Sequence, residues 1–201
     1  MFTTERGAIA CRAAAGRIPA MGAGAAGRAA AAAGVAEARG QAAVAARAEE
    51  APAVAGDMKP DEMLSHIDDA SVIAAIHAVE SRSGGEVRVC ITGRSVDDPV
   101  FEAWQAFARL KMNRTRQRNA ALVFIAPETR KFAIVGDEGL HRHCAADFWN
   151  QLAEELADGF RKEDYTGALT RVIDSIGGVL SLHFPPQRDG SDELPNEIVR
   201  E

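Results

Sequence analysis

Residues 120–126 read Ala-Ala-Leu-Val-Phe-Ile-Ala, seven consecutive residues without a polar side chain. A continuous apolar run of this length is typical of a strand that is buried on both faces. Such a strand needs a covering layer on each face of the sheet, and the helical periodicity of the flanking segments predicts that helices form both layers. The run therefore predicts an α/β fold, and the neighbouring segments predict its topology.

Two further strands flank this run. Residues 86–91, Glu-Val-Arg-Val-Cys-Ile, alternate between polar and apolar side chains, which predicts a half-buried strand. Residues 131–135, Lys-Phe-Ala-Ile-Val, predict a third strand after the turn at 127–130. The short turn makes the third strand antiparallel to the second, whereas the helix between the first two strands makes those two parallel.

Helical periodicity fills the remaining intervals. Apolar residues at spacings of three and four predict one helix from Pro60 to the stop at Ser83-Gly84-Gly85. Asp98-Pro99 begins a second helix, residues 145–160 form a third, and Asp164 caps a fourth. The order α-β-α-β-β-α-α predicts a three-layer α/β/α sandwich on a small mixed sheet.

Composition excludes several classes of protein. The 201 residues carry a formal net charge of −6, which argues against a nucleic-acid binder, because phosphate contacts need clustered cations. No stretch approaches the ~20 bulky apolar residues of a membrane span. The cysteines Cys11, Cys90 and Cys144 share no Cys-x-x-Cys spacing, which excludes a disulfide scaffold and a cysteine-rich zinc module.

The chain divides into three parts. Residues 1–56 hold 24 alanines and 8 glycines and predict an Ala/Gly/Arg-rich disordered extension, residues 57–185 form the domain, and residues 186–201 form an acidic tail. The extension is either a tail or an upstream continuation of the reading frame, with Met58 rather than Met1 as the natural start. Both of these indicate a cytoplasmic protein. The alternatives are an organelle transit peptide and a secretory signal, which would send the protein to an organelle or export it.

Acidic and amide side chains lie where this topology brings strand ends together. Parallel strands start at one edge of a sheet and the antiparallel third strand ends there, so Glu86, Asn119 and Asp137 should converge, with Glu80 adjacent. Their oxygens suit Ca²⁺ or Mg²⁺, and repulsion among the carboxylates favours a bound cation. The alternative is that Glu80 and Glu86 only pair with arginines, namely Arg82, Arg88, Arg116 or Arg118.

Two other clusters favour a structural interpretation. His141, His143 and Cys144 have metal-like spacing but lack a second pair of ligands, so a solvent-facing loop is expected rather than a zinc site. Cys90 lies within a strand, where a small buried residue is expected rather than a nucleophile.

Five motifs occur in a fixed order along the domain. They are Glu-Ser-Arg-Ser-Gly-Gly-Glu-Val-Arg-Val at 80–89, Leu-Lys-Met at 110–112 with Thr115 and Asn119, the apolar run at 120–126, Phe-Ala-Ile-Val-Gly-Asp-Glu-Gly at 132–139, and His-Phe-Pro at 183–185. This ordered set resembles the TPM domain family over about residues 63–185. Ala120 departs from the family pattern, which usually has glycine after the asparagine, and residues 192–197 resemble the ending of short stand-alone bacterial members.

The resemblance implies a Rossmann-like domain that binds a divalent cation, with Glu80, Glu86 and Asp137 at the family's acidic positions. Two functions follow from it. One is a cation-binding domain that acts through a protein partner as a binding or regulatory module. The alternative is the acid-phosphatase activity of plant members, in which a metal would polarise the phosphoryl group and Arg116 and Arg118 would hold the phosphate. Because no motif here supplies a nucleophile, the sequence leaves it open whether the protein is an enzyme.

Overall fold

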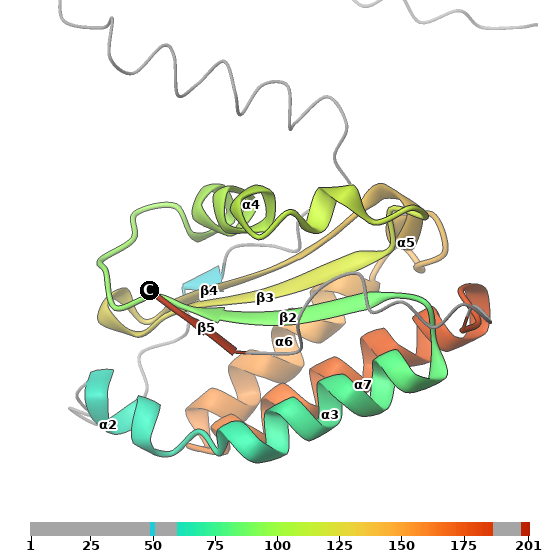
Figure 1. Ribbon diagram of the computed structural model, residues 1–201. Coiled ribbons are helices and arrows are strands. Elements are labelled where there is room, and N and C mark those ends of the chain that lie inside the picture. Colours follow the sequence, from blue (N-terminus) through green and yellow to red (C-terminus); the bar gives the residue numbers. More distant parts are fainter. Residues whose placement is uncertain (1–48, 51–59, 187–197) are drawn as a thin grey trace, which may run out of the picture.

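The computed structural model describes residues 49–50, 60–186 and 198–201 (Figure 1). A five-stranded sheet in the order β1-β4-β3-β2-β5 forms its centre. The three predicted strands are confirmed as β2 (Glu86–Ile91), β3 (Ala120–Ala126) and β4 (Lys131–Gly136). The sheet also has two short edge strands, β1 (Glu49–Glu50) and β5 (Ile198–Arg200), and the sequence pattern predicts neither of them.

The predicted strand directions are confirmed. β3 pairs in parallel with β2, with Ala120 opposite Glu86, and antiparallel with β4, with Ala121 opposite Gly136. At the edges, β1 pairs antiparallel with β4 and β5 pairs in parallel with β2. The amino ends of β2 and β3 and the carboxyl end of β4 therefore lie at the same edge of a mixed sheet.

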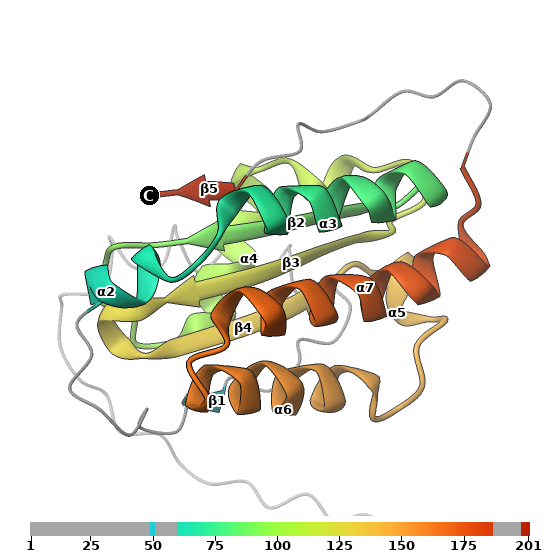
Figure 2. The same ribbon diagram turned by 90° about the horizontal axis from the view of Figure 1, so that it is seen from below.

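Helices cover both faces of the sheet and give the predicted three-layer α/β/α sandwich (Figures 1 and 2). One face carries α4 (Pro99–Arg109). The other face carries α3 (Asp69–Arg82), α6 (Phe148–Arg161) and α7 (Tyr165–His183), which lie side by side beneath the strands. Four short elements complete the described fold: α2 (Pro60–Ser65), η1 (Met112–Arg114), η2 (Pro127–Thr129) and α5 (Glu138–His141).

Alternate side chains of β3 reach two separate cores. Val123 and Ile125 pack with α3, α6 and α7, while Leu122 and Phe124 pack with α4. All seven residues of the strand are buried. This double coverage explains why the sequence of β3 is apolar throughout.

The first helical region is two helices, so the prediction of a single helix is wrong. α2 (Pro60–Ser65) ends before α3 begins, and Asp68 lies between them in an extended conformation. The Asp68 carboxylate accepts from the Ala70 N–H at 3.2 Å, and such a capping acceptor starts a new helix. Leu64 and Ile67 still pack against the core, so the apolar spacing continues across the break.

The other predicted helix starts follow their capping residues. The Asp98 carboxylate accepts from the Val100 and Phe101 N–H groups at 3.0 Å each, and the Asp164 carboxylate accepts from the Gly167 N–H at 3.1 Å. Both confirm the predicted starts of α4 and α7. The remaining helix, α6, begins at Phe148, three residues later than the apolar periodicity indicates.

β2 is buried on both faces, which corrects the prediction of a half-buried strand. Val87 and Val89 pack in the larger core, whereas Cys90 packs in the core under α4. Arg88 shares the α4 face by alternation and is only 3% exposed. The alternation therefore marks two buried environments rather than a buried face and a solvent face.

The predicted extension and acidic tail fall largely outside the described residues, so the division at residues 56 and 185 stays a prediction. Within the described ranges, residues 49–50 form β1 and residues 198–200 form β5. None of the helices in this part of the chain has the length and apolar character that crossing a membrane requires.

Candidate functional site

Glu86, Asn119 and Asp137 lie at one edge of the sheet, as the topology predicts. The Glu86 N–H donates to the Asn119 carbonyl at 3.4 Å, and the Asp137 N–H donates to the Ala120 carbonyl at 2.8 Å. These main-chain bonds tie the start of β2, the start of β3 and the end of β4 together. The three side chains therefore belong to one location, which we call the acidic rim.

The acidic rim is shielded from solvent. Glu86 is 6% exposed, Asn119 is 1% exposed and Asp137 is 0% exposed. Carboxylates are rarely buried to this extent unless a positive charge or hydrogen-bond donors stabilise them. The partners of these side chains therefore decide what the rim can bind.

Asp137 has two partners in the described structure. Its Oδ1 accepts from the Glu138 N–H at 2.8 Å and caps α5. Its Oδ2 lies 2.8 Å from Nε of Arg118, in an ion pair with that guanidinium. Arg118 stands in the loop just before β3, so the pair joins the two strand ends through side chains as well as main chain.

The Arg118 loop packs tightly against α5 because of Gly139. Arg118 has a φ of 53°, and its carbonyl accepts from the Leu140 N–H at 3.1 Å. A Cβ atom at Gly139 would lie 2.1 Å from the Gln117 carbonyl oxygen and 2.6 Å from that of Arg118. Gly139 is thus required for the close approach that holds Arg118 beside Asp137. Sequence reasoning assigned it no such role.

Glu80 and Asn119 connect the rim to the preceding helix and turn. Glu80 on α3 accepts from the Val87 N–H through Oε1 at 3.3 Å. Asn119 donates from Nδ2 to the Gly84 carbonyl at 2.8 Å, and the Gly84 N–H in turn donates to the Phe184 carbonyl at 2.7 Å. Both side chains therefore have structural contacts in addition to any ligand that they could hold.

The donor set of the rim suits a hard cation in kind, because it offers carboxylate and amide oxygens. Within the described residues, no group of three or more histidine, cysteine, aspartate or glutamate side chains is arranged to hold a metal ion. A cation at Glu86 and Asp137 would thus need further ligands from Asn119, main-chain carbonyls or water. The fit is to an open site with few protein ligands rather than to a closed cage.

The histidines of the His141 region have separate partners. Nδ1 of His141 lies 3.0 Å from Nε1 of Trp149, so the indole donates to the ring. His143 instead stacks on His183, with ring centroids 4.2 Å apart and an interplanar angle of 19°. The structure therefore uses these side chains for packing between α5, α6 and α7.

Burial raises the thiol pKa of both cysteines in the described part of the chain. Cys90 is 0% exposed, which confirms that it is a small buried residue. Burial and, to a lesser extent, the nearby Glu201 carboxylate raise the pKa of the Cys90 thiol to about 12. Burial also raises the pKa of Cys144 to about 11. At neutral pH both thiols stay protonated, a poor state for a nucleophile.

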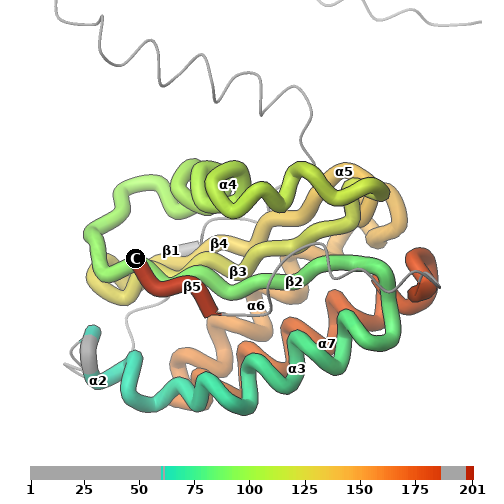
Figure 3. The backbone as a smooth tube through the Cα atoms, viewed as in Figure 1, coloured from blue at the N-terminus to red at the C-terminus, as the bar shows by residue number. Residues whose placement is uncertain are grey.

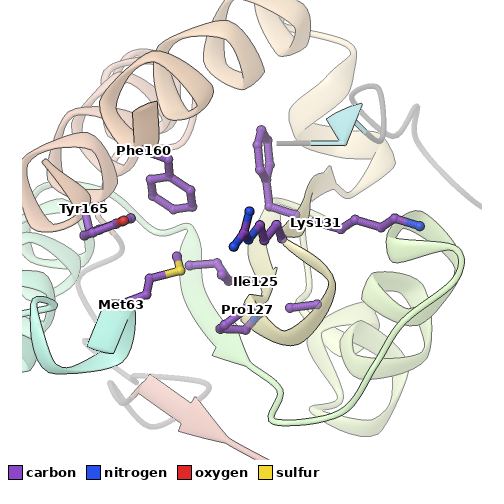
Figure 4. Close-up of a pocket in the computed structure, with 9 residues that line it drawn as sticks. Met63, Ile125, Pro127, Lys131, Phe160 and Tyr165 are labelled. Carbon is purple, nitrogen blue, oxygen red and sulfur yellow. The ribbon is translucent and has the colours of Figure 1, made fainter. Parts of the chain in front are cut away.

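A small pocket lies at the opposite end of the sheet from the acidic rim (Figure 4). It forms around the end of β3, where Ile125 faces Met63 of α2 and Tyr165 of α7. Its lining is mostly apolar, so it is chemically distinct from the rim. The other residues around it are Ala126, Pro127, Arg130, Lys131, Phe132 and Phe160.

These features define a class of protein, an α/β/α sandwich domain with one buried carboxylate at the amino end of a parallel strand and another just after the carboxyl end of the antiparallel strand at the same edge. A family model described as the TPM domain matches residues 58–179. The chain belongs to the TPM domain family, as its motifs indicate. The match spans the three long strands, the helices between them and most of α7.

Two solved structures are similar to this chain. The BA42 protein from the psychrophilic bacterium Bizionia argentinensis is similar over 74% of this chain and 98% of its own, with 28% identity and a TM-score of 0.60. The amino-terminal domain of cg2496 from Corynebacterium glutamicum covers 56% of this chain and 70% of its own, with 19% identity and a TM-score of 0.43. No curated protein sequence matches significantly.

Proposed function

We propose that this TPM domain binds a divalent cation, Ca²⁺ or Mg²⁺, at the acidic rim and acts as a binding or regulatory module for a protein partner. The observation that carries the proposal is the burial of Glu86 and Asp137, at 6% and 0% exposure, beside Asn119. Two carboxylates and an amide oxygen held at one location form a donor set of the kind that Ca²⁺ and Mg²⁺ prefer.

Glu86 and Asp137 are the primary ligands in this proposal, and Glu80 is an additional carboxylate at its margin. The Arg118 guanidinium now supplies the positive charge next to Asp137. A cation that binds there must compete with this guanidinium for the carboxylate. Binding would therefore release Arg118 and loosen the loop that precedes β3, which gives the module a way to signal its occupancy.

The alternative is a metal-assisted acid phosphatase. The position of Arg118 at the rim favours this alternative, since a phosphate bound there would meet a guanidinium and the cation together. Arg116 lies exposed on the same loop and could contact the phosphate. The bound metal would polarise the phosphoryl group when present.

Calorimetric titration of the full chain with Ca²⁺ and with Mg²⁺ tests cation binding. We expect Glu86→Gln and Asp137→Asn to weaken binding at least about tenfold, since each removes a charged ligand. Arg118→Gln should strengthen binding, because it removes the competing charge. The matched control is Glu154→Gln, which neutralises an exposed carboxylate on α6. Equal binding by all four variants, or no heat with either ion, would rule out a cation site at the rim.

Turnover separates the two functions. p-Nitrophenyl phosphate is incubated with the same full-chain proteins, with and without each ion. Cation binding without turnover selects the binding module. Metal-dependent turnover that is lost in a folded Asp137→Asn variant selects the phosphatase.

Localisation is a separate prediction, which amino-terminal sequencing of the native protein tests by showing whether residues 1–57 are retained.

A further inference from the structure

Residues 198–201 lie along the outer edge of β2 and extend the sheet by one short parallel strand (Figures 1 and 3). Val199 stands opposite Cys90 at the centre of this ladder. Beyond the ladder, the Glu201 N–H donates to the last carbonyl of β2 at 3.0 Å, and the Gly93 N–H donates to the Glu201 carbonyl at 2.7 Å. Main-chain pairing thus continues past the end of β5.

Two arginines from other elements contact the Glu201 side chain. Arg109 at the end of α4 donates to both carboxylate oxygens, with Nε 3.2 Å from Oε1. Arg94 lies in the loop after β2, and its Nη2 is 3.6 Å from Oε2 of Glu201. The Glu201 side chain is only 20% exposed as a result. Charge-assisted bonds to both oxygens of one carboxylate are geometrically specific.

The remaining side chains of the segment have contacts on alternate faces of the sheet. Val199 packs against the core under α4, while Ile198 packs against the larger core. Nη2 of Arg200 lies 2.5 Å from Oδ1 of Asp69, the first residue of α3. On one face of the sheet, Asp69 therefore pairs with Arg200. On the other face, Arg94 and Arg109 pair with Glu201.

We propose that the outer edge of β2 is a strand-docking site that recognises an extended apolar-apolar-Arg-Glu segment, and that residues 198–201 occupy it in the same chain as a detachable strand. Strand addition of this kind takes its affinity from main-chain bonds and its specificity from alternate side chains. Both features are present here. The proposal is independent of the acidic rim, which lies at the other end of β2.

The segment has the properties of an element that opens locally. β5 has three residues and pairs on one side only, and none of its residues is fully buried. Short edge elements with few buried contacts open at lower free energy than central strands. Tethering in the same chain raises the effective concentration of the segment to about the millimolar range, so a free peptide competes with it poorly.

The test uses the full chain with changes in the segment alone, which leave the docking edge intact. Val199→Asp places a carboxylate against the apolar core, and Glu201→Lys opposes Arg94 and Arg109. Glu154→Lys is the control for an equal charge change on an exposed helix surface. The probe is a fluorescent peptide with the sequence of residues 194–201, amidated at its end, and binding is measured by polarisation.

We expect both segment variants to bind the peptide and to bind it roughly tenfold or more tightly than the wild type or the Glu154→Lys control. A Glu201→Gln peptide should lose roughly tenfold in affinity. Alkylation of Cys90, followed by mass spectrometry, should be faster in both variants, because the segment that pairs with Cys90 and contacts its thiol through Glu201 no longer docks. Absence of peptide binding to folded variants, or equal binding to the wild type, would overturn the proposal.

Amide hydrogen exchange on the wild type provides a second test that needs no variant. The Glu201 and Gly93 amides should exchange much faster than the Thr92 amide, which donates across to Ile125 of β3 at 2.9 Å. Equal protection of these amides would show that the segment does not detach. A stable dimer of the wild type in which the segment of one copy occupies the edge of another would overturn the assignment to the same chain.

Discussion

Arg118 and Asp137 form an ion pair that spans two strand ends, with Nε of the arginine 2.8 Å from Oδ2 of the aspartate. The Asp137 side chain is 1% exposed, whereas that of Arg118 is 33% exposed. The arginine therefore remains accessible to solvent and to an incoming ligand, while the aspartate is enclosed. This difference makes Arg118 the side of the pair that can move.

Asp137→Asn should lower the free energy of unfolding by about 1–3 kcal/mol, because it removes the buried carboxylate charge that pairs with Arg118. Asparagine keeps an oxygen that can cap α5, so Asp137→Ala should cost about 1 kcal/mol more. Urea denaturation of both variants measures the difference. Arg118→Gln combined with Asp137→Asn should be less harmful than the two single changes added together, and strict additivity would contradict a coupled pair.

Gly139→Ala should destabilise the fold by about 2 kcal/mol or more, because the new methyl group would meet main-chain oxygens at 2.1 and 2.6 Å. The Arg118 loop must then move away from α5. Gly178→Ala in α7 is the matched control, since a Cβ there meets no atom within 4 Å. Its better helix propensity should raise stability by about 0.5–1 kcal/mol. Thermal or urea unfolding of the two variants should shift in opposite directions.

Asp98→Ala should cost about 1 kcal/mol, because the carboxylate caps two N–H groups at the start of α4. The adjacent Asp97→Ala is the control. The Asp97 side chain is exposed, and Lys131 contacts only its main-chain carbonyl, so stability should change by less than about 0.5 kcal/mol. Equal losses in the two variants, measured by chemical denaturation, would show that capping is not the cause.

Alkaline pH should weaken the fold partly through Cys90. Burial raises the pKa of this thiol from 9.0 to about 12, so the folded protein holds the proton more tightly than the unfolded chain. The stabilisation is complete below pH 9 and is lost as the pH rises towards 12. Urea midpoints from about pH 8 to about pH 10.5 should therefore fall more steeply in the wild type than in Cys90→Ala. Parallel slopes would contradict this assignment.

The centre of the fold could be predicted because its physical causes are local. The apolar run of β3 can be stable only between two layers, and the short turn that ends at Arg130 fixes the direction of β4. Capping residues such as Asp98 and Asp164 specify helix starts within a few residues. From these, the meeting of Glu86 and Asp137 at one edge follows as geometry.

What could not be predicted depends on contacts between distant elements. The alternation in β2 leaves open whether Arg88 faces water or a covering helix, because only the position of α4 decides that. The break at Asp68 is hidden because Leu64 and Ile67 keep the helical spacing across it. In both cases packing, rather than local preference, determines the outcome.

The sequence also does not predict which residue pairs with Asp137. The sequence indicates that arginines near the acidic residues could pair with them or bind a phosphate, but it does not select one. The selection comes from the left-handed backbone of Arg118 and from the tight contact at Gly139, neither of which leaves a pattern along the chain. β5 was missed for a similar reason, since three residues in a charged tail form a strand only against β2, with Asp69 and Arg109 in reach.

The two outermost strands of the sheet have a practical consequence. β1 (Glu49–Glu50) and β5 (Ile198–Arg200) both lie outside residues 58–179, the region that the family model matches. A recombinant fragment trimmed to that region would leave β4 and β2 as bare edges and would shorten α7. Bare edges expose rows of unsatisfied main-chain groups that invite intermolecular aggregation. Soluble material for biochemistry is therefore best made with both flanking segments retained.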